Sequence, residues 1–121
     1  MKLKPVQKLA GWGLELAPFA LPVKPLRQAR HWMVFNHPHP SYAVHIMLVP
    51  RKNVTDWMSV EPGQMDLEST KEFIELTQSI ILEYNLIETG YRLILNGGSY
   101  QTFPHMHVHL VSGAAMATHK E

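Results

Sequence analysis

Three histidines at alternate positions, His105, His107 and His109, are the residues of this sequence best suited to chemistry. A β-strand sends alternate side chains to opposite faces, so a strand over residues 105–111 places all three imidazoles on one face. The apolar residues between them then face the core. Three imidazoles in a row have no packing role, and imidazole is the side chain that changes charge near neutral pH. We interpret them as a functional site rather than a solvated polar face.

Two kinds of chemistry fit three histidines on one strand. Three neutral imidazoles can bind a catalytic zinc ion. However, same-face positions spread them over roughly 13 Å of strand, and the segment lacks the carboxylates that normally orient histidine ligands. An imidazole can also act as a nucleophile that its neighbours orient. The spacing favours the nucleophile, with a tri-histidine metal protein as an alternative.

The bulk composition limits the remaining classes of function. The 121 residues are 45% hydrophobic and 17% charged, which is typical of one folded domain, here residues 1–121. A formal net charge of +1 gives no basic stripe for a long nucleic acid. There are no cysteines, which excludes disulfides and fits a reducing compartment. No apolar run is long enough to span a membrane, and Glu15 and two prolines interrupt the stretch that faintly resembles a signal peptide. We therefore expect a cytoplasmic protein.

The pattern of the chain predicts the elements that must position these histidines. Alternating apolar residues predict strands over residues 31–35, 43–49, 91–95 and 105–111. A helix is expected from residue 70 to residue 84, with Ser69 and Glu72 as a capping box. Residues 1–20 form an N-terminal extension that Pro5 can open as a helix, and residues 21–112 form the core. The fold class is α+β, an antiparallel sheet of about five strands with one long helix across a face.

The alternation of histidine and apolar residues over 105–111 resembles the signature of the histidine triad superfamily. Residues 41–52 resemble that family's upstream strand, in which a histidine, here His45, precedes an aliphatic run ending in Val-Pro-Arg-Lys. Residues 91–96 are similar to the strand leading into its active-site loop. Gln101 and Thr102 match its phosphate-contacting pair. These segments follow one another in the family's order, which makes a chance likeness unlikely.

The resemblance implies an α+β protein that forms a homodimer by joining two sheets. It implies a nucleotide hydrolase or nucleotidyl transferase that needs no cofactor and cleaves at the α-phosphate of a nucleoside phosphoramidate or dinucleoside polyphosphate. His107 would attack the phosphorus and be transiently nucleotidylated. His105 and His109 would orient it and handle protons, and His45 would join their hydrogen-bond network. The residues that would contact phosphate or ribose are Gln101, Thr102 and Asn96.

The sequence departs from the family's usual pattern in three places, which include Pro104 immediately before the triad. His37 stands where the family commonly has an acidic residue that holds the ribose hydroxyls, and the loop over residues 96–101 is shorter than in typical nucleoside phosphoramidases. We expect His37 and Phe35 to line the nucleotide site, because they adjoin the presumed ribose position. The departures leave a second hypothesis open, a nucleotide-binding or interaction module with the same fold and little turnover.

Overall fold

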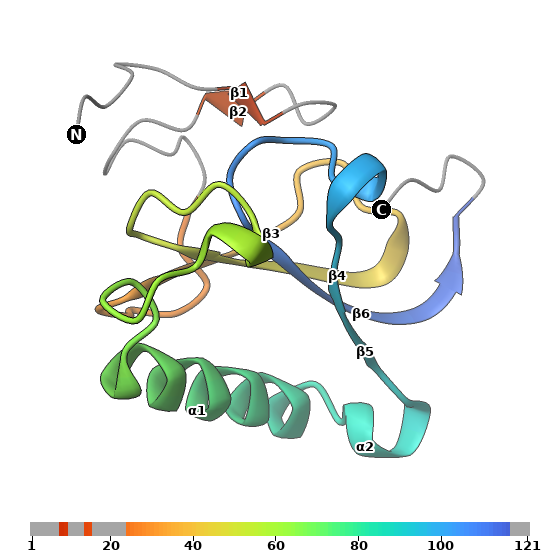
Figure 1. The fold of residues 1–121 in the computed structure, drawn as a ribbon. Coiled ribbons are helices and arrows are strands. Elements are labelled where there is room, and N and C mark those ends of the chain that lie inside the picture. The colour runs from red at the N-terminus through yellow and green to blue at the C-terminus, as the bar shows by residue number, and fades with distance from the viewer. Residues whose placement is uncertain (1–7, 10–13, 16–23, 117–121) are drawn as a thin grey trace.

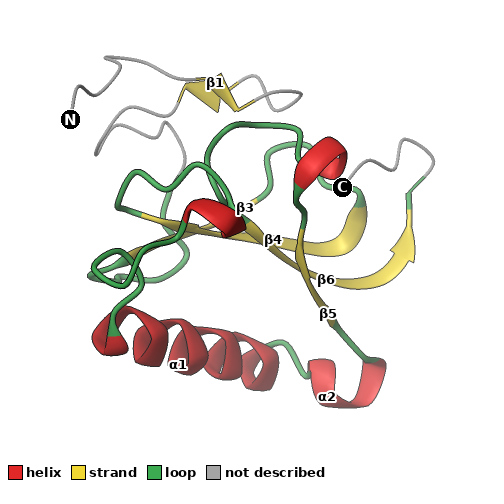
Figure 2. Cartoon of the chain, in the orientation of Figure 1, coloured by secondary structure: helices red, strands yellow, loops and turns green. Residues whose placement is uncertain are grey.

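A four-stranded antiparallel sheet forms the centre of the computed structural model, which describes residues 8–9, 14–15 and 24–116. Its strands lie in the order β3-β4-β6-β5, and helix α1 lies across one face (Figure 1). The strands of the sheet are β3 (Trp32–Asn36), β4 (Tyr42–Pro50), β5 (Arg92–Leu95) and β6 (Val108–Ala115). The helices are α1 (Leu67–Glu83) and α2 (Leu86–Thr89), with single 3₁₀ turns η1 (Trp57–Ser59) and η2 (Gly98–Tyr100) (Figure 2).

The structure confirms the predicted α+β class, with four strands in the main sheet. All four predicted strands and the long helix are present with shifted ends. In the N-terminal extension, β1 (Lys8–Leu9) and β2 (Leu14–Glu15) pair as antiparallel strands. The helix predicted there is therefore wrong at these four residues, and the rest of it lies outside the described residues. Over the described part of the chain, no helix is long and apolar enough to cross a membrane.

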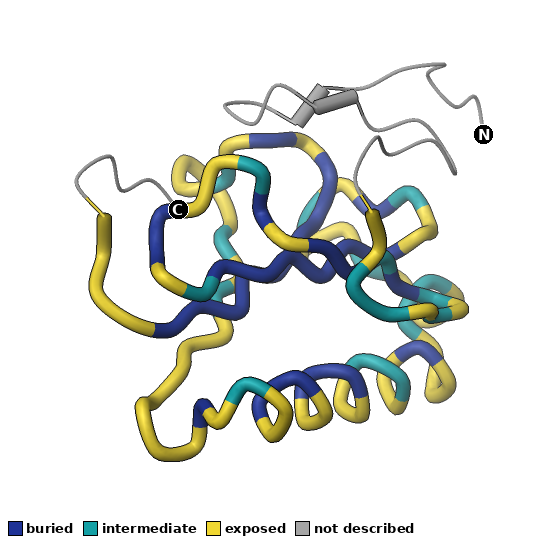
Figure 3. Tube along the Cα trace, turned by 180° about the vertical axis from the view of Figure 1, so that it is seen from behind, coloured by how far each residue is buried: buried dark blue, intermediate teal, exposed yellow. Residues whose placement is uncertain are grey.

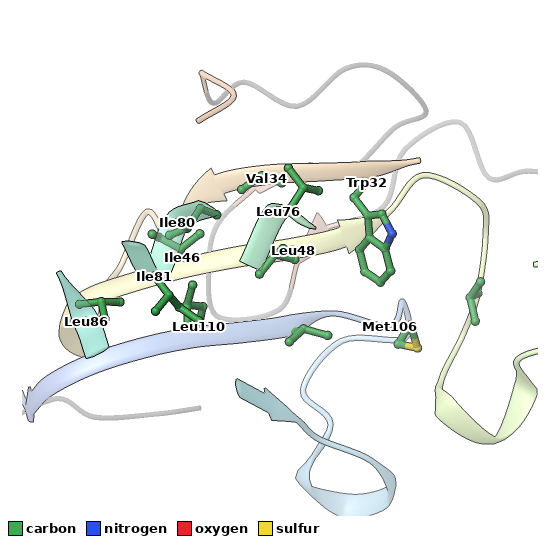
Figure 4. Close-up of a cluster of buried hydrophobic side chains, with 12 residues drawn as sticks. Trp32, Val34, Ile46, Leu48, Leu76, Ile80, Ile81, Leu86, Met106 and Leu110 are labelled. Carbon is green, nitrogen blue, oxygen red and sulfur yellow. The ribbon is translucent and has the colours of Figure 1, made fainter. Parts of the chain in front are cut away.

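The hydrophobic core lies between α1 and one face of the sheet, which the even-numbered residues of β3, β4 and β6 form. Side chains from all the central strands meet the buried face of α1 there, as Figure 4 shows. The labelled members include Val34, Ile46, Leu48, Leu110, Leu76 and Ile80. Both faces of the central strands are buried (Figure 3). Because side chains alternate along a strand, the odd-numbered positions of β3, β4 and β6 face away from α1, and His45 and His109 occupy two of them.

Helix α1 begins three residues earlier than predicted. Its N-cap is Asp66, whose carboxylate accepts a hydrogen bond of 2.9 Å from the Ser69 amide, so the predicted capping box is wrong. The Glu72 carboxylate instead accepts the three successive amides of residues 30–32 at 2.7–3.0 Å. The indole of Trp32 donates to the Ser69 carbonyl at 2.9 Å. These bonds fasten the start of β3 to the first turns of α1, a use of Glu72 that local sequence spacing cannot show.

Strand β6 begins at Val108, not at His105 as predicted, and runs to Ala115, into a tail for which the sequence predicts no element. The last pair of its ladder with β4 joins Val108 to Leu48. The backbone before Val108 does not continue the ladder with β4, because the Met106 amide donates to the Val54 carbonyl at 2.8 Å. His105 and His107 therefore lie on a loop that leads into the strand.

A glycine allows β6 to pass close to an irregular part of β4. The register between the two strands shifts between Tyr42 and Val44, and Gly113 lies opposite with φ +89°. A Cβ at Gly113 would stand 2.9 Å from the Ala43 Cβ.

We expect Gly113→Ala to lower the free energy of unfolding by about 1–3 kcal/mol, since it adds backbone strain to a steric clash. Urea denaturation measures this loss. The control is Gly63→Ala, where an added Cβ meets nothing within 4 Å, and the change should stay within about 0.5 kcal/mol. Equal stabilities for the two variants would contradict the expectation.

Candidate active site

Five buried imidazoles gather on the sheet face opposite α1. The exposed fractions are 5% for His105, 3% for His107, 1% for His109, 3% for His45 and 6% for His37. Ring centroids are 5.2 Å apart for His107 and His109, 5.1 Å for His45 and His109, and 4.4 Å for His37 and His45. The cluster forms because β4 and β6 are antiparallel neighbours in which His109 pairs with Met47. His45 is therefore the diagonal neighbour of His109 on the same face.

A backbone carbonyl holds His107 in one tautomer. Its Nδ1 lies 2.7 Å from the His105 carbonyl oxygen. A carbonyl only accepts, so Nδ1 carries the hydrogen and, in the neutral ring, Nε2 carries the lone pair. Burial lowers the pKa of His107 below its usual value, although the bond to the His105 carbonyl opposes this effect. His107 is thus neutral at pH 7 with a nucleophilic Nε2.

His45 and His109 form a hydrogen-bonded chain with one direction. The Ser41 amide donates to Nδ1 of His45 at 3.0 Å, which places the hydrogen of a neutral His45 on Nε2. That Nε2 lies 2.8 Å from Nδ1 of His109, so His45 donates and the hydrogen of His109 is on Nε2. Burial, together with the neighbouring imidazoles His107, His45 and His37, lowers the pKa of His109 to about 3. His109 is thus a neutral imidazole whose Nε2 carries a hydrogen.

The imidazole of His105 fastens the loop that carries His107. Its ring Nε2 donates to the Pro50 carbonyl at 3.0 Å, at the end of β4. Burial lowers the pKa of His105, partly offset by this bond. The atom of His105 that contacts the His107 ring is its carbonyl oxygen. Orientation of the His107 ring thus involves the backbone of His105, and the imidazole of His105 anchors that backbone.

Comparison with known proteins places this site in a family. The sequence matches the HIT domain over residues 22–116. The chain belongs to the HIT family. It is 30% identical over 95 residues to an uncharacterised HIT-like protein of Rickettsia prowazekii, an alignment that covers 77% of this chain and 78% of that protein.

Solved structures of HIT proteins share the fold. A histidine triad protein from Clostridium difficile is 26% identical with a TM-score of 0.67, over 82% of this chain and 86% of that one. A HIT family hydrolase from Legionella pneumophila is 24% identical with a TM-score of 0.68, over 80% of this chain and 87% of that one. The superfamily resemblance of the triad segment is therefore confirmed for the chain.

The structure brings His37 into the histidine cluster of this HIT protein. Its Nδ1 accepts a hydrogen bond of 3.0 Å from the His39 amide, so a neutral His37 has its hydrogen on Nε2. Burial is the largest cause that lowers its pKa to about 3, followed by His45, His39 and His107. Phe35 is 1% exposed and pairs with Met47, which puts it on the same sheet face. Where the family commonly has an anionic acceptor, this site has a neutral ring.

Gln101, Asn96 and Thr102, the loop residues predicted to contact the nucleotide, differ in their hydrogen bonds and their exposure. The side-chain amide of Gln101 donates to the Thr55 carbonyl at 2.7 Å and to the Phe103 carbonyl at 2.9 Å. Asn96 is half-buried at the end of β5 and Thr102 is exposed. Among the described residues, no hydrogen bond joins Asn96 or Thr102 to a histidine. The nucleotide-contacting roles of these residues stay predictions.

The groups that sequence reasoning missed are backbone atoms. The Ser41 amide sets the tautomer of His45, and the His105 and Pro50 carbonyls set those of His107 and His105. Backbone atoms leave no residue-type signal in a sequence. Within residues 24–116, no group of three or more His, Asp or Glu side chains is arranged to hold a metal ion. Each triad imidazole has one ring nitrogen in a hydrogen bond within the protein.

Proposed function

We propose that this protein is a nucleotide hydrolase or nucleotidyl transferase that cleaves at the α-phosphate through a nucleotidylated His107. The observation that carries the proposal is the bond from His107 Nδ1 to the His105 carbonyl. It presents the Nε2 lone pair of a neutral imidazole without any proton transfer beforehand. Membership of the HIT family and the Legionella HIT family hydrolase of the same fold support a hydrolytic reaction.

In the first step, His107 Nε2 attacks the α-phosphorus of a nucleoside phosphoramidate or dinucleoside polyphosphate. The Nε2–P bond forms as the bond from phosphorus to the amine or phosphate breaks, and the leaving group takes that electron pair. The ring becomes positively charged, and the His105 carbonyl on Nδ1–H stabilises the charge. His109 lies beside His107, and its Nε2–H donates a hydrogen bond that stabilises charge on the departing atom, which then takes its proton from water.

In the second step, water attacks the same phosphorus and the Nε2–P bond breaks. The electron pair returns to Nε2, which restores the neutral His107 ring, and the attacking water releases its proton to the solvent. His45 holds His109 in the required tautomer throughout, because its Nε2–H occupies Nδ1 of His109. One difficult displacement is thus divided into two easier ones.

Four residues are proposed to contact the nucleotide because of their positions relative to the histidines. His37 and Phe35 lie on β3 or directly after it, on the histidine face and next to His45. They are placed to contact the ribose or base, while Asn96 and Thr102 flank the shortened loop on the phosphate side. Because a neutral His37 offers a single donor, it would hold the ribose hydroxyls less firmly than a carboxylate. That observation favours a second candidate, a nucleotide-binding module with little turnover.

Detection of the covalent intermediate separates the two candidates. The protein is incubated with an adenosine phosphoramidate, release of the amine is followed, and an acid-labile nucleotidyl adduct is sought by mass spectrometry on residues 105–109. We expect amine release and an adduct on His107. Binding of AMP with neither product nor adduct from phosphoramidates or dinucleoside polyphosphates would support the binding module instead.

A homodimer through the edge at β5 is also proposed. Leu93 and Leu95 pair with the core residues Leu110 and Val108, yet they remain 44% and 37% exposed. An apolar strand at a sheet edge is normally paired or covered.

Light scattering should therefore give twice the chain mass of 13.8 kDa. Leu93→Glu combined with Leu95→Glu should give the monomer mass, whereas Leu67→Glu, at a 79% exposed position on α1, should leave the mass unchanged. A wild-type protein that is monomeric at micromolar concentration would rule the dimer out.

A further inference from the structure

The loop that delivers the nucleophile is tied to the loop after β4. The His105 ring donates to the Pro50 carbonyl at 3.0 Å, and the Met106 amide donates to the Val54 carbonyl at 2.8 Å. Gln101 donates to the Thr55 carbonyl at 2.7 Å. Three hydrogen bonds thus join residues 101–106 to residues 50–55 just before His107.

Gln101 bridges the two loops with both of its side-chain hydrogens. One is donated to the Thr55 carbonyl and the other to the Phe103 carbonyl at 2.9 Å. The Phe103 carbonyl also accepts the His105 amide at 2.9 Å. We propose that Gln101 is a positioning residue that fixes the triad loop against residues 50–55, and not a donor to the substrate phosphate. The proposal rests on His107 being the nucleophile.

The chemistry of an amide side chain supports this assignment. A glutamine amide has two hydrogens to donate, and its oxygen only accepts. With both hydrogens engaged, Gln101 presents to a phosphate only an oxygen, which repels the phosphate oxygens.

The loop to which Gln101 is bonded is itself anchored. Lys52 Nζ donates to the Gly63 carbonyl at 2.7 Å, and the side-chain Nε2 of Gln64 donates to the Asn53 carbonyl at 3.4 Å. Gln101 therefore connects the triad loop to a fixed platform. The His107 tautomer depends on the position of the His105 carbonyl, so movement of this loop would disturb the nucleophile.

Amide hydrogen exchange on the ligand-free protein tests the positioning role directly. The variants are Gln101→Ala and the similarly sized Gln101→Glu, and the control is Gln78→Ala on the exposed side of α1. We expect the His105 and Met106 amides to exchange about 3- to 10-fold faster in both Gln101 variants, since each lost bond loosens the loop. The Gln78 variant should match the wild type. Unchanged protection of both amides would overturn the proposal, because a phosphate ligand has no effect before a nucleotide binds.

Kinetics and AMP affinity provide the second arm. Displacement of the nucleophile should lower kcat for Gln101→Ala on the order of 10- to 100-fold, with the Kd for AMP changed by less than about twofold. A rise in the Kd for AMP that matches the whole loss of kcat/KM would show a phosphate ligand and overturn the proposal. If the wild type forms no product, the proposed hydrolase fails, and the exchange measurement still decides the role of Gln101.

Discussion

Replacing His107 with alanine is expected to lower turnover of an adenosine phosphoramidate by at least about 10,000-fold, the scale seen when an enzyme loses its nucleophile. The covalent adduct on residues 105–109 should disappear as well. The fold should persist, because the side chain lies on the histidine face and not in the core beside α1. Amine release under single-turnover conditions measures the loss.

Two controls accompany this variant. AMP should still bind His107→Ala, since the proposed contacts to ribose, base and phosphate come from other residues. His109→Gln should retain more activity than His107→Ala, because loss of one hydrogen bond to developing charge typically costs on the order of 100- to 1,000-fold. A His107→Ala protein that hydrolyses at close to the wild-type rate would end the proposed mechanism.

Stability should fall steeply as the pH drops below 6.5. The pKa values of His37 and His109 are about 3 in the folded protein, against the usual 6.5 in the unfolded chain. Between these values the unfolded chain binds protons that the folded protein does not. Each such histidine therefore removes about 1.4 kcal/mol from the free energy of unfolding per pH unit of acidification. His105 and His107, whose pKa values are also lowered by burial, add to the slope.

Urea denaturation at several pH values between 4.5 and 6.5 measures this slope. Asp66 does not interfere, because its pKa lies below the usual carboxyl value and its contribution is lost only at lower pH. His37→Gln should reduce the slope of the unfolding free energy against pH by about 1.4 kcal/mol per pH unit, which corresponds to one proton. Gln78→Ala, on the exposed side of α1, should leave the slope unchanged. A free energy of unfolding that is constant over this range would contradict the neutral, buried state of the cluster.

The alternation of residue types over 105–111 predicted which side chains face the core. It did not predict the hydrogen bonds that the backbone of this segment makes. Met106, Val108 and Leu110 are core residues, as the pattern over residues 105–111 predicts. The strand nevertheless starts only at Val108, because the Met106 amide bonds to Val54 instead of to β4. Sequence periodicity reports which way side chains point, and it carries no information on which carbonyl receives an amide.

Ser69 and Glu72 show the same limit in a helix. Their spacing matches a capping box, but Asp66 provides another good N-cap three residues earlier. The choice between them depends on a tertiary contact, because Glu72 is engaged by the amides of residues 30–32. Likewise, the resemblance of His45 to a family position predicted its place beside the triad, whereas the direction of its bond to His109 depends on the Ser41 amide.

The paired bonds Lys52–Gly63 and Gln64–Asn53 close the base of the segment between β4 and α1. Glu72 separately fixes α1 to β3, so the docking of the helix does not depend on the length of that segment. The three hydrogen bonds described between this part of the chain and the triad loop are made by the carbonyls of Pro50, Val54 and Thr55. The tip at Trp57 and Met58, 56% and 88% exposed, is thus mechanically separate from the site. It is the natural place to graft a peptide tag or a fluorescent reporter into this protein.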